Sequence, residues 1–332
     1  MNLDSVRELK QTLVVRVLQK IETIISARPA FGRAARPVAR AAEPPRTLAL
    51  GVSRKGKADF QLAVRVQRRI FEDSPEVDLI TKRAKGEVDV RYVGGIQKHA
   101  RRWYQQRQRP ALIGCSVGHF KITGGTLGCF VQPRTGGGVC ILSNNHVLAD
   151  ENRARKNDAI LQPGTFDEGA DPDDTIAMLT RFVRLKRSGR NLVDCAIATV
   201  NEGITFDRAR LRGLGKLAGL SDTFLEEGEV VAKIGRTTGL TRGRVTAFEL
   251  DNVIVRFDIG NLRFDNQIEI EGMGDAPFSD GGDSGSLIIG EDKRGVALLF
   301  AGGDQGGTNG KGLTYANPLR AVLDALKVNL AL

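Results

Sequence analysis

Short apolar runs separated by turn residues dominate the chain from residue 111 to residue 316. Each run has the length of a strand rather than of a helix, and the chain as a whole contains 39 glycines and few aromatic residues. The clearest runs are 139–142, 196–200, 230–234, 253–257 and 287–289. Residues 111–316 are therefore predicted to be all-β.

A helical pattern follows these runs. Asn317 is placed to cap a helix, Pro318 suits its first position, and apolar residues recur at 319, 322, 323 and 326. A closing helix is predicted over 317–330.

The first 110 residues have a different pattern. Apolar residues at 6, 9, 13, 17, 21 and 24, with Ser5 and Glu8 spaced as a capping box, predict an amphipathic helix within 1–27. Its apolar face must pack on the all-β region or on a second copy. Residues 28–46 hold four prolines without periodicity and indicate a linker. Strands at 48–52, 58–66 and 88–93 and a helix at 75–84 predict a small α+β unit over 47–110.

Charge separates the same two regions. Residues 1–110 contain 24 Lys and Arg against 11 acidic residues, or +13, whereas the remainder contains 25 against 28, or −3. In Lys98–Arg107 the cations interleave with Trp103 and Tyr104, a pattern that fits nucleic-acid binding. A solvated helix or a clasp for an acidic partner is the alternative. Residues 1–110 are thus a candidate surface for a regulatory protein or for homo-oligomer contacts.

Three segments carry the residues of a nucleophilic site. Ser284 lies in the sequence Gly-Asp-Ser-Gly, a turn that glycines keep open around a nucleophile. His146 follows an apolar run, where a general base would emerge at a strand end. Asp194 lies within another apolar run and could hold the imidazole tautomer, although beginning a strand or capping a turn is the alternative for a lone acid. Together they predict a Ser-His-Asp triad.

The order of the three residues selects a fold. His, then Asp, then Ser is the order of chymotrypsin-like enzymes and differs from that of subtilisins and α/β-hydrolases. The intervals from 146 to 194 and from 194 to 284 leave room for one β-barrel and most of a second. The predicted fold is a mainly β, chymotrypsin-like double barrel, with barrels near 111–205 and 206–316.

These segments resemble those of a known family. Ser143–Val147, Val193–Ile197 and Gly282–Gly285 look like the triad motifs of trypsin-like serine peptidases. A bacterial branch related to the plant narrow-leaf protease is indicated by four more segments: 124–130, 160–164, 235–241 and 298–302. The resemblance covers roughly residues 47 to 330.

The resemblance implies a role for each residue. Ser284 would attack the scissile carbonyl, His146 would serve as base and then acid, and Asp194 would orient His146. The backbone N–H groups of Gly282 and Ser284 would form the oxyanion hole. Hydrolysis of a protein or peptide substrate in this way needs no metal or organic cofactor.

Asp283 raises the question of activation. In the secreted relatives this aspartate pairs with a new N-terminus that cleavage releases, but no matching cleavage site precedes His146, and Arg109 is followed by Pro110. Asp283 is therefore expected to be satisfied by a backbone amide or an internal cation. The site would then be preformed or gated by a partner.

The resemblance also places a specificity pocket. Phe278, six residues before the nucleophile, would form its base, with plain core packing as the alternative. Phe300, Ala301 and Gly302 would form its wall. Because no acid stands at 278, a preference for small or apolar side chains is expected rather than one for Lys or Arg.

The cysteines and the lack of targeting segments in the sequence indicate the cellular compartment of the protein. Cys115, Cys129, Cys140 and Cys195 fall in or beside apolar runs and are predicted to be buried hydrophobes. The charged first ten residues do not read as a signal peptide, and no apolar run is long enough to span a membrane, so a cytoplasmic location is expected. Two function classes remain: a serine endopeptidase, or a latent scaffold on a protease fold that associates with nucleic acid.

Overall fold

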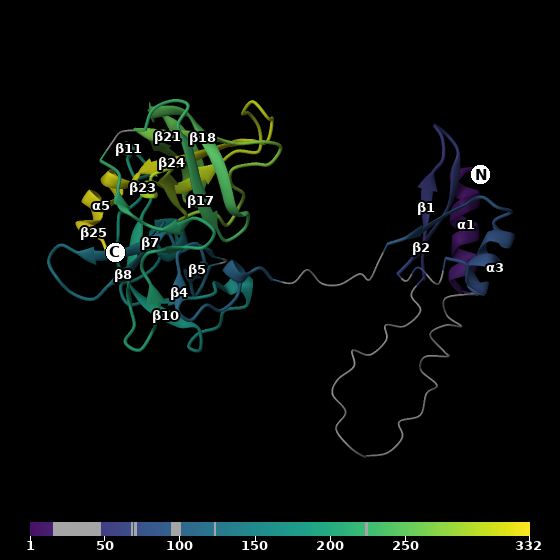
Figure 1. Cartoon of the computed structure of the whole chain (residues 1–332), viewed down its shortest axis with the longest axis horizontal. Helices are drawn as coiled ribbons and strands as arrows, with labels where there is room; N and C mark the ends of the chain where they lie inside the picture. The colour runs from purple at the N-terminus through teal and green to yellow at the C-terminus, as the bar shows by residue number, and fades with distance from the viewer. Residues whose placement is uncertain (16–47, 68, 70–71, 94–100, 123, 223–224) are drawn as a thin grey trace, which may run out of the picture. The chain divides into compact units, whose positions relative to one another are not determined.

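The computed structural model describes the chain apart from residues 16–47, 68, 70–71, 94–100, 123 and 223–224. The chain forms two compact units, Met1–Ala100 and Arg101–Leu332 (Figure 1). The predicted linker at 28–46 and the C-terminal half of the predicted first helix lie outside the described residues.

The N-terminal unit packs two helices on a three-stranded sheet. Its elements are α1 (Leu3–Leu13), β1 (Leu48–Arg54), β2 (Phe60–Val66), α3 (Pro75–Arg83) and β3 (Val88–Tyr92). β1 and β2 are antiparallel, whereas β2 and β3 are parallel and need a crossover, which α3 supplies. The three strands and α3 lie where the hydrophobic pattern predicted them.

The first helix differs from its prediction in its cap and in its packing. Asn2, not Ser5, is the N-cap residue, and its side chain accepts the Ser5 N–H at 2.8 Å. Val6 and Leu13 are buried against the sheet of the same unit rather than on the all-β region or a second copy. The prediction overlooked the nearest apolar surface, which is the sheet that the following residues form.

The first sheet of the unit Arg101–Leu332 has eight antiparallel strands. Its order is β25-β7-β8-β12-β10-β9-β5-β6. The strands are β5 (Ser116–His119), β6 (Gly125–Thr126), β7 (Cys129–Pro133), β8 (Cys140–Ser143), β9 (Ala159–Leu161), β10 (Thr175–Phe182), β12 (Ala196–Val200) and β25 (Val328–Leu330). Leu127 donates its N–H to the Cys115 carbonyl at 2.8 Å and so continues the pairing of β6 with β5, whereas the next residue, Gly128, donates to the Leu142 carbonyl of β8 at 2.9 Å. The chain thus passes directly from one end of the strand order to the other, which curls the sheet into a barrel.

The second sheet has the order β16-β23-β22-β17-β18-β21-β24, and an additional pairing of β23 with β24 closes it. The strands are β16 (Gly219–Leu220), β17 (Val230–Gly235), β18 (Gly239–Leu250), β21 (Gln267–Gly272), β22 (Leu287–Gly290), β23 (Arg294–Gly302) and β24 (Leu313–Pro318). Within this unit, Figure 1 shows the teal first sheet beside the green and yellow second sheet. The predicted mainly β, chymotrypsin-like double barrel is confirmed.

A hairpin extends from the second barrel between β18 and β21. It consists of β19 (Val253–Phe257) and β20 (Gly260–Phe264). β20 pairs in parallel with β11 (Arg190–Asn191), a short strand that lies in the sequence between β10 and β12 of the first barrel and ends three residues before Asp194. The hairpin therefore connects the two barrels near a predicted site residue.

The chain ends on a helix and a strand that tie the barrels together. α5 (Leu319–Leu326) buries Leu319, Val322, Leu323 and Leu326, and β25 then joins the first sheet. The helix is shorter than the predicted 317–330, and Asn317 does not cap it. Asn317 lies in β24 with its side chain bonded elsewhere, and Pro318 takes the N-cap position.

The four cysteines are buried free thiols, as predicted. All four lie in the largest apolar core, to which both barrels contribute. Among the described residues, no helix combines the length and the apolar character needed to cross a bilayer.

Candidate active site

His146 and Asp194 meet at the end of two neighbouring strands of the first barrel. β8 leads into α4 (Asn145–Leu148), which carries His146, and Asp194 lies two residues before the start of β12, the strand paired with β8. His146 Nδ1 lies 2.5 Å from Asp194 Oδ2. The predicted base and its orienting carboxylate are therefore hydrogen-bonded.

Asp194 is fully buried and held on several sides. Its Oδ1 accepts the backbone N–H groups of Asn145 at 2.7 Å and His146 at 3.3 Å. Its own N–H donates to the Asn317 side chain at 2.8 Å, and its carbonyl accepts from the Asn144 amide at 2.7 Å. A buried carboxylate needs such donors, and these bonds fix the direction in which it meets the imidazole.

The surroundings of His146 favour its protonated form. Burial opposes a charged imidazole, but the Asp194 carboxylate, its hydrogen bond and the nearby Glu151 outweigh that effect and raise the pKa of His146. An imidazolium formed during a reaction would be stabilised in the same way.

Ser284 approaches this pair from the second barrel. Its carbonyl accepts the Thr126 N–H at 2.8 Å. A Cβ placed on Gly125 would lie 2.8 Å from that carbonyl oxygen and 2.5 Å from Val147, the residue after His146. In the described part of the chain the Ser284 hydroxyl makes no hydrogen bond, so the structure does not join it to His146. Catalytic hydrogen bonds are often long without substrate and tighten when it binds.

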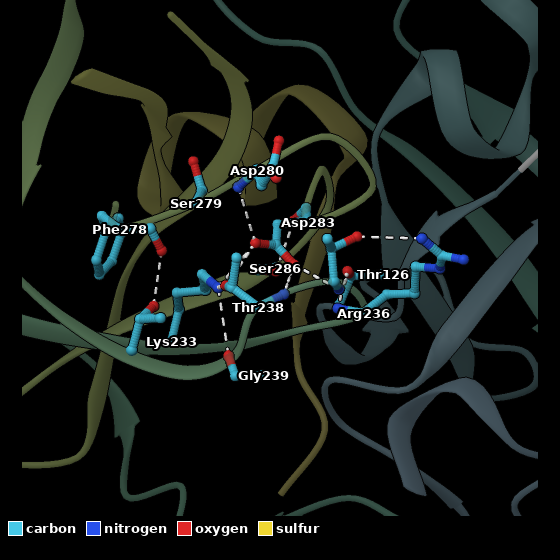
Figure 2. Close-up of polar contacts among 12 residues, drawn as sticks. Thr126, Lys233, Arg236, Thr238, Gly239, Phe278, Ser279, Asp280, Asp283 and Ser286 are labelled. Atoms are coloured by element: carbon cyan, nitrogen blue, oxygen red, sulfur yellow. Dashed lines mark hydrogen bonds and ion pairs between the residues drawn. The ribbon is translucent and has the colours of Figure 1, made fainter. Parts of the chain in front are cut away.

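Asp283 is anchored beneath the nucleophile turn. Lys233 Nζ donates to its carboxylate at 3.0 Å, and both side chains are fully buried. The backbone N–H groups of Thr237 and Asp280 also donate to it, at 2.7 and 3.1 Å (Figure 2). An internal cation and backbone amides thus satisfy Asp283, which confirms the expectation from the sequence.

The turn leaves two backbone donors unused. In the described residues, the N–H groups of Gly282 and Ser284 donate to no internal acceptor, whereas the Asp283 carbonyl between them accepts the Ser286 N–H and hydroxyl at 3.0 and 2.6 Å. Gly282 and Gly285 have φ values of +95° and +90°, which side-chain-bearing residues rarely adopt. Two unpaired donors beside a nucleophile suit a developing oxyanion.

A cavity of about 540 Å³ opens next to Ser284. Ala301 and Gly302, two of the residues predicted to form the pocket wall, line it together with Ser279, Asp280 and Asp304. Phe278 and Phe300 are not among its lining residues. Phe278 is 1% exposed in the core of the second barrel, and Phe300 is 3% exposed against Phe264.

The β19–β20 hairpin covers one side of His146. The ring of Phe257 meets the imidazole edge to face, with centroids 5.8 Å apart. Glu151, in the loop after α4, accepts the backbone N–H groups of Asp258 at 3.1 Å and Ile259 at 3.0 Å. This carboxylate fixes the hairpin tip against the first barrel.

Other residues raised by the sequence have structural partners. Arg101 donates to the Asp167 carbonyl at 2.8 Å, and Arg107 lies 3.3 Å from Asp174, so this end of the basic segment pairs with an acidic loop. Another histidine of the chain, His119, is buried and lies 3.0 Å from Asp158. In the described residues no cluster of His, Cys, Asp or Glu could hold a metal ion.

The comparisons with known proteins concern the fold. No protein-family model matches the chain, and no curated protein matches its sequence. The chain is similar to the solved structure of Cellulomonas bogoriensis chymotrypsin, with 18% identity over 67% of this chain and 98% of that chain and a TM-score of 0.45. Thermobifida fusca protease A matches with 16% identity over 66% and 97% and a TM-score of 0.45. A serine protease specific for glutamic acid matches with 18% identity over 67% and 100% and a TM-score of 0.48.

Sequence reasoning missed several residues of the site. Lys233 left one signal, since a lysine inside the apolar run 230–234 must find a buried partner. Asn144 and Asn317 left none, because polar residues beside strands usually face solvent.

Proposed function

We propose that this chain is a serine endopeptidase that hydrolyses peptide bonds through an acyl-enzyme on Ser284. The observation that carries the proposal is the anchored nucleophile turn: Asp283 is bound by Lys233, and the N–H groups of Gly282 and Ser284 have no internal acceptor in the described residues. The hydrogen-bonded pair of His146 and Asp194 supplies a base on the other barrel.

The chemistry would run in two halves. Ser284 Oγ attacks the scissile carbonyl carbon while His146 takes the hydroxyl proton, and the resulting oxyanion accepts from Gly282 and Ser284 N–H. Asp194 stabilises the imidazolium. His146 then gives the proton to the leaving amine, and a water activated by His146 hydrolyses the ester on Ser284.

The ammonium group of Lys233 bears on whether the site needs proteolytic cleavage to become active. In the enzymes that the chain resembles, an ammonium released by cleavage pairs with the aspartate before the nucleophile, and here Lys233 supplies that charge. We propose that the site is assembled without cleavage. Four further statements stay predictions from the sequence. They are control by a partner or an oligomer through residues 1–110, a nucleic-acid association, a cytoplasmic location, and the relation to the narrow-leaf branch.

Labelling with a fluorophosphonate probe tests the proposal. Wild-type protein should label rapidly and the Ser284→Ala variant should not, since fast phosphonylation requires an activated serine and an oxyanion hole. Equal rates for the two proteins would favour the latent scaffold instead.

Substrate preference is proposed from the cavity beside Ser284. Leu299, Ala301 and Gly302 support the predicted preference for small or apolar side chains. Sequencing the new N-termini that the enzyme creates in a peptide library would test it. Cleavage mainly after Lys or Arg would contradict this preference and point to Asp280 and Asp304, which the sequence did not place in the cavity.

A further inference from the structure

Two threonine hydroxyls donate hydrogen bonds to backbone carbonyl groups of the nucleophile turn, the segment that carries Gly282 and Ser284. Thr237 Oγ1 donates to the Gly281 carbonyl at 2.6 Å. Thr126 Oγ1 donates to the Gly282 carbonyl at 3.0 Å. Thr237 lies between β17 and β18 of the second barrel, and Thr126 lies in β6 of the first, so both barrels contact the turn.

Arg236 fixes the direction of both hydroxyl groups. Its Nη1 donates to Thr237 Oγ1 at 3.1 Å, and its backbone N–H donates to Thr126 Oγ1 at 2.9 Å. A guanidinium and an amide N–H can only donate, and a hydroxyl has a single hydrogen. Each threonine must therefore accept from Arg236 and has its one hydrogen left for a turn carbonyl. Figure 2 shows Arg236 beside Thr126 and near the Asp283 turn.

The direction of the Gly281 carbonyl determines the direction of the Gly282 N–H. The two groups belong to one planar trans peptide, so they point opposite ways. While Thr237 holds the carbonyl, the N–H points the opposite way within the peptide plane, where it has no internal acceptor in the described residues. A flip of this peptide would break the bond to Thr237 and remove one of the two oxyanion donors.

Arg236 is itself fixed in place. Its Nε and Nη2 donate to the two carboxylate oxygens of Asp167 at 2.8 and 2.7 Å, and the two side chains are 9% and 5% exposed. The Phe166 ring lies 4.4 Å from its guanidinium carbon. A Cβ on Gly282 would approach Thr237 Oγ1 to 2.6 Å and Arg236 Nη1 to 3.1 Å. The turn is built directly against this pair.

We infer that Arg236 and Thr237 are positioning residues that hold the Gly282 N–H toward the oxyanion, with Thr126 supporting the next carbonyl. The inference deepens the proposed function and rests on it. It predicts an effect on the transition state rather than on substrate binding, because the Gly282 N–H bonds most strongly to the developing oxyanion.

A matched pair of variants isolates the hydroxyl. Thr237→Val keeps the shape of the side chain without its hydroxyl, whereas Thr237→Ser keeps the hydroxyl. We expect Thr237→Val to lower kcat on the order of 10-fold to 100-fold with KM nearly unchanged, less than the loss when a donor is removed outright. Its affinity for a peptide aldehyde, whose adduct carries the oxyanion, should fall by the same factor. Thr237→Ser should stay within about threefold of wild type on both measures.

Three outcomes would overturn the inference: kcat of Thr237→Val equal to wild type, equal losses in both variants, or a rise in KM with unchanged aldehyde affinity. Thr126→Val and Thr126→Ser provide a second matched pair if Thr237→Val does not fold. Phosphonylation of wild-type Ser284 is measured first. If wild type does not react, the proposed function fails, and that result is distinct from a reactive wild type with unaffected variants.

Discussion

The carboxylate of Asp283 is surrounded by five donors: Lys233 Nζ, the N–H groups of Asp280, Thr237 and Thr238, and the Thr238 hydroxyl. A fully buried acid is tolerated only when its charge and lone pairs are satisfied in this way. Lys233 is the one cation among these donors. At the scale of single residues, this ion pair keeps the nucleophile turn folded.

Replacing Lys233 with Met should therefore disable the site. The variant leaves the Asp283 charge buried without its counterion, which costs about 3–5 kcal/mol in comparable buried pairs. We expect a lower melting temperature and at least a ~100-fold loss in kcat/KM. Lys216→Met, at an exposed position of β15 (Gly215–Lys216), is the control and should behave as wild type. Full activity in Lys233→Met would show that the pair does not support the turn.

The pH profile should be bounded by two of these residues. His146 must be neutral to act as base, and its pKa is raised, so activity should rise with pH through a value above 6.5. Lys233 must be charged, and burial lowers its pKa despite the opposing effect of Asp283. As the pH rises further, activity should therefore fall again, and the midpoint of this alkaline limb should lie below pH 10.5. Measuring kcat/KM against pH tests both limbs. An acid limb below 6.5 would contradict the role of Asp194.

At the scale of elements, the β19–β20 hairpin contacts the candidate site. β20 pairs with β11 just before Asp194, Glu151 binds the hairpin tip, and Phe257 packs on His146. The hairpin thus touches both the base and the segment that carries its orienting acid. We therefore expect the hairpin to limit how far the imidazole can rotate away from Asp194.

Phe257→Ala tests this role of the hairpin. Loss of the ring frees the imidazole on one side, and we expect kcat/KM to fall about 10-fold, since a small displacement of a catalytic group is enough to slow reaction. The melting temperature should change little because Phe257 is only partly buried. Phe248→Ala, at an exposed position of β18, is the matched control. Equal activity of the two variants would contradict a contact between hairpin and base that matters for catalysis.

Elements were predictable where their cause is local. The strands at 230–234, 253–257 and 287–289 appear as β17, β19 and β22 because each contains its own apolar pattern. What each strand packs against depends on residues far away in the chain, so neither the Phe257 contact nor the use of Asn317 by Asp194 left a local signal. His146 and Asp194 were found because their chemistry restricts residue type, order and spacing together. The role of Lys233 could have been inferred from its place inside the apolar run 230–234, because a lysine buried there needs a partner of opposite charge.

At the scale of the whole molecule, the chain divides into two units with separate cores. All the partners of His146, Asp194 and Asp283 described above lie in Arg101–Leu332. The basic excess lies in the first 110 residues, where the sequence predicts a regulatory or oligomeric contact. The residues of the proposed active site thus lie in one unit, and partner binding stays a prediction for the other.

A chain shortened to residues 101–332 should therefore keep its active site. We expect its rate of fluorophosphonate labelling to lie within about threefold of the rate of the full chain, since every contact described above for the site lies within residues 101–332. A rate at least ~10-fold lower, with the shortened chain still folded by circular dichroism, would show that residues 1–100 take part in assembling the site. A rate at least ~10-fold higher would show that they restrain it.

The most direct test of the account is the acyl-enzyme itself. A nitrophenyl ester mixed rapidly with the full chain should release a burst of nitrophenol that approaches one equivalent per active site. Acid quenching and mass spectrometry should then locate the acyl group on Ser284, and the Ser284→Ala variant should give neither burst nor adduct. Hydrolysis without a burst and without an adduct on Ser284, or an equal burst from the alanine variant, would contradict a mechanism through this serine.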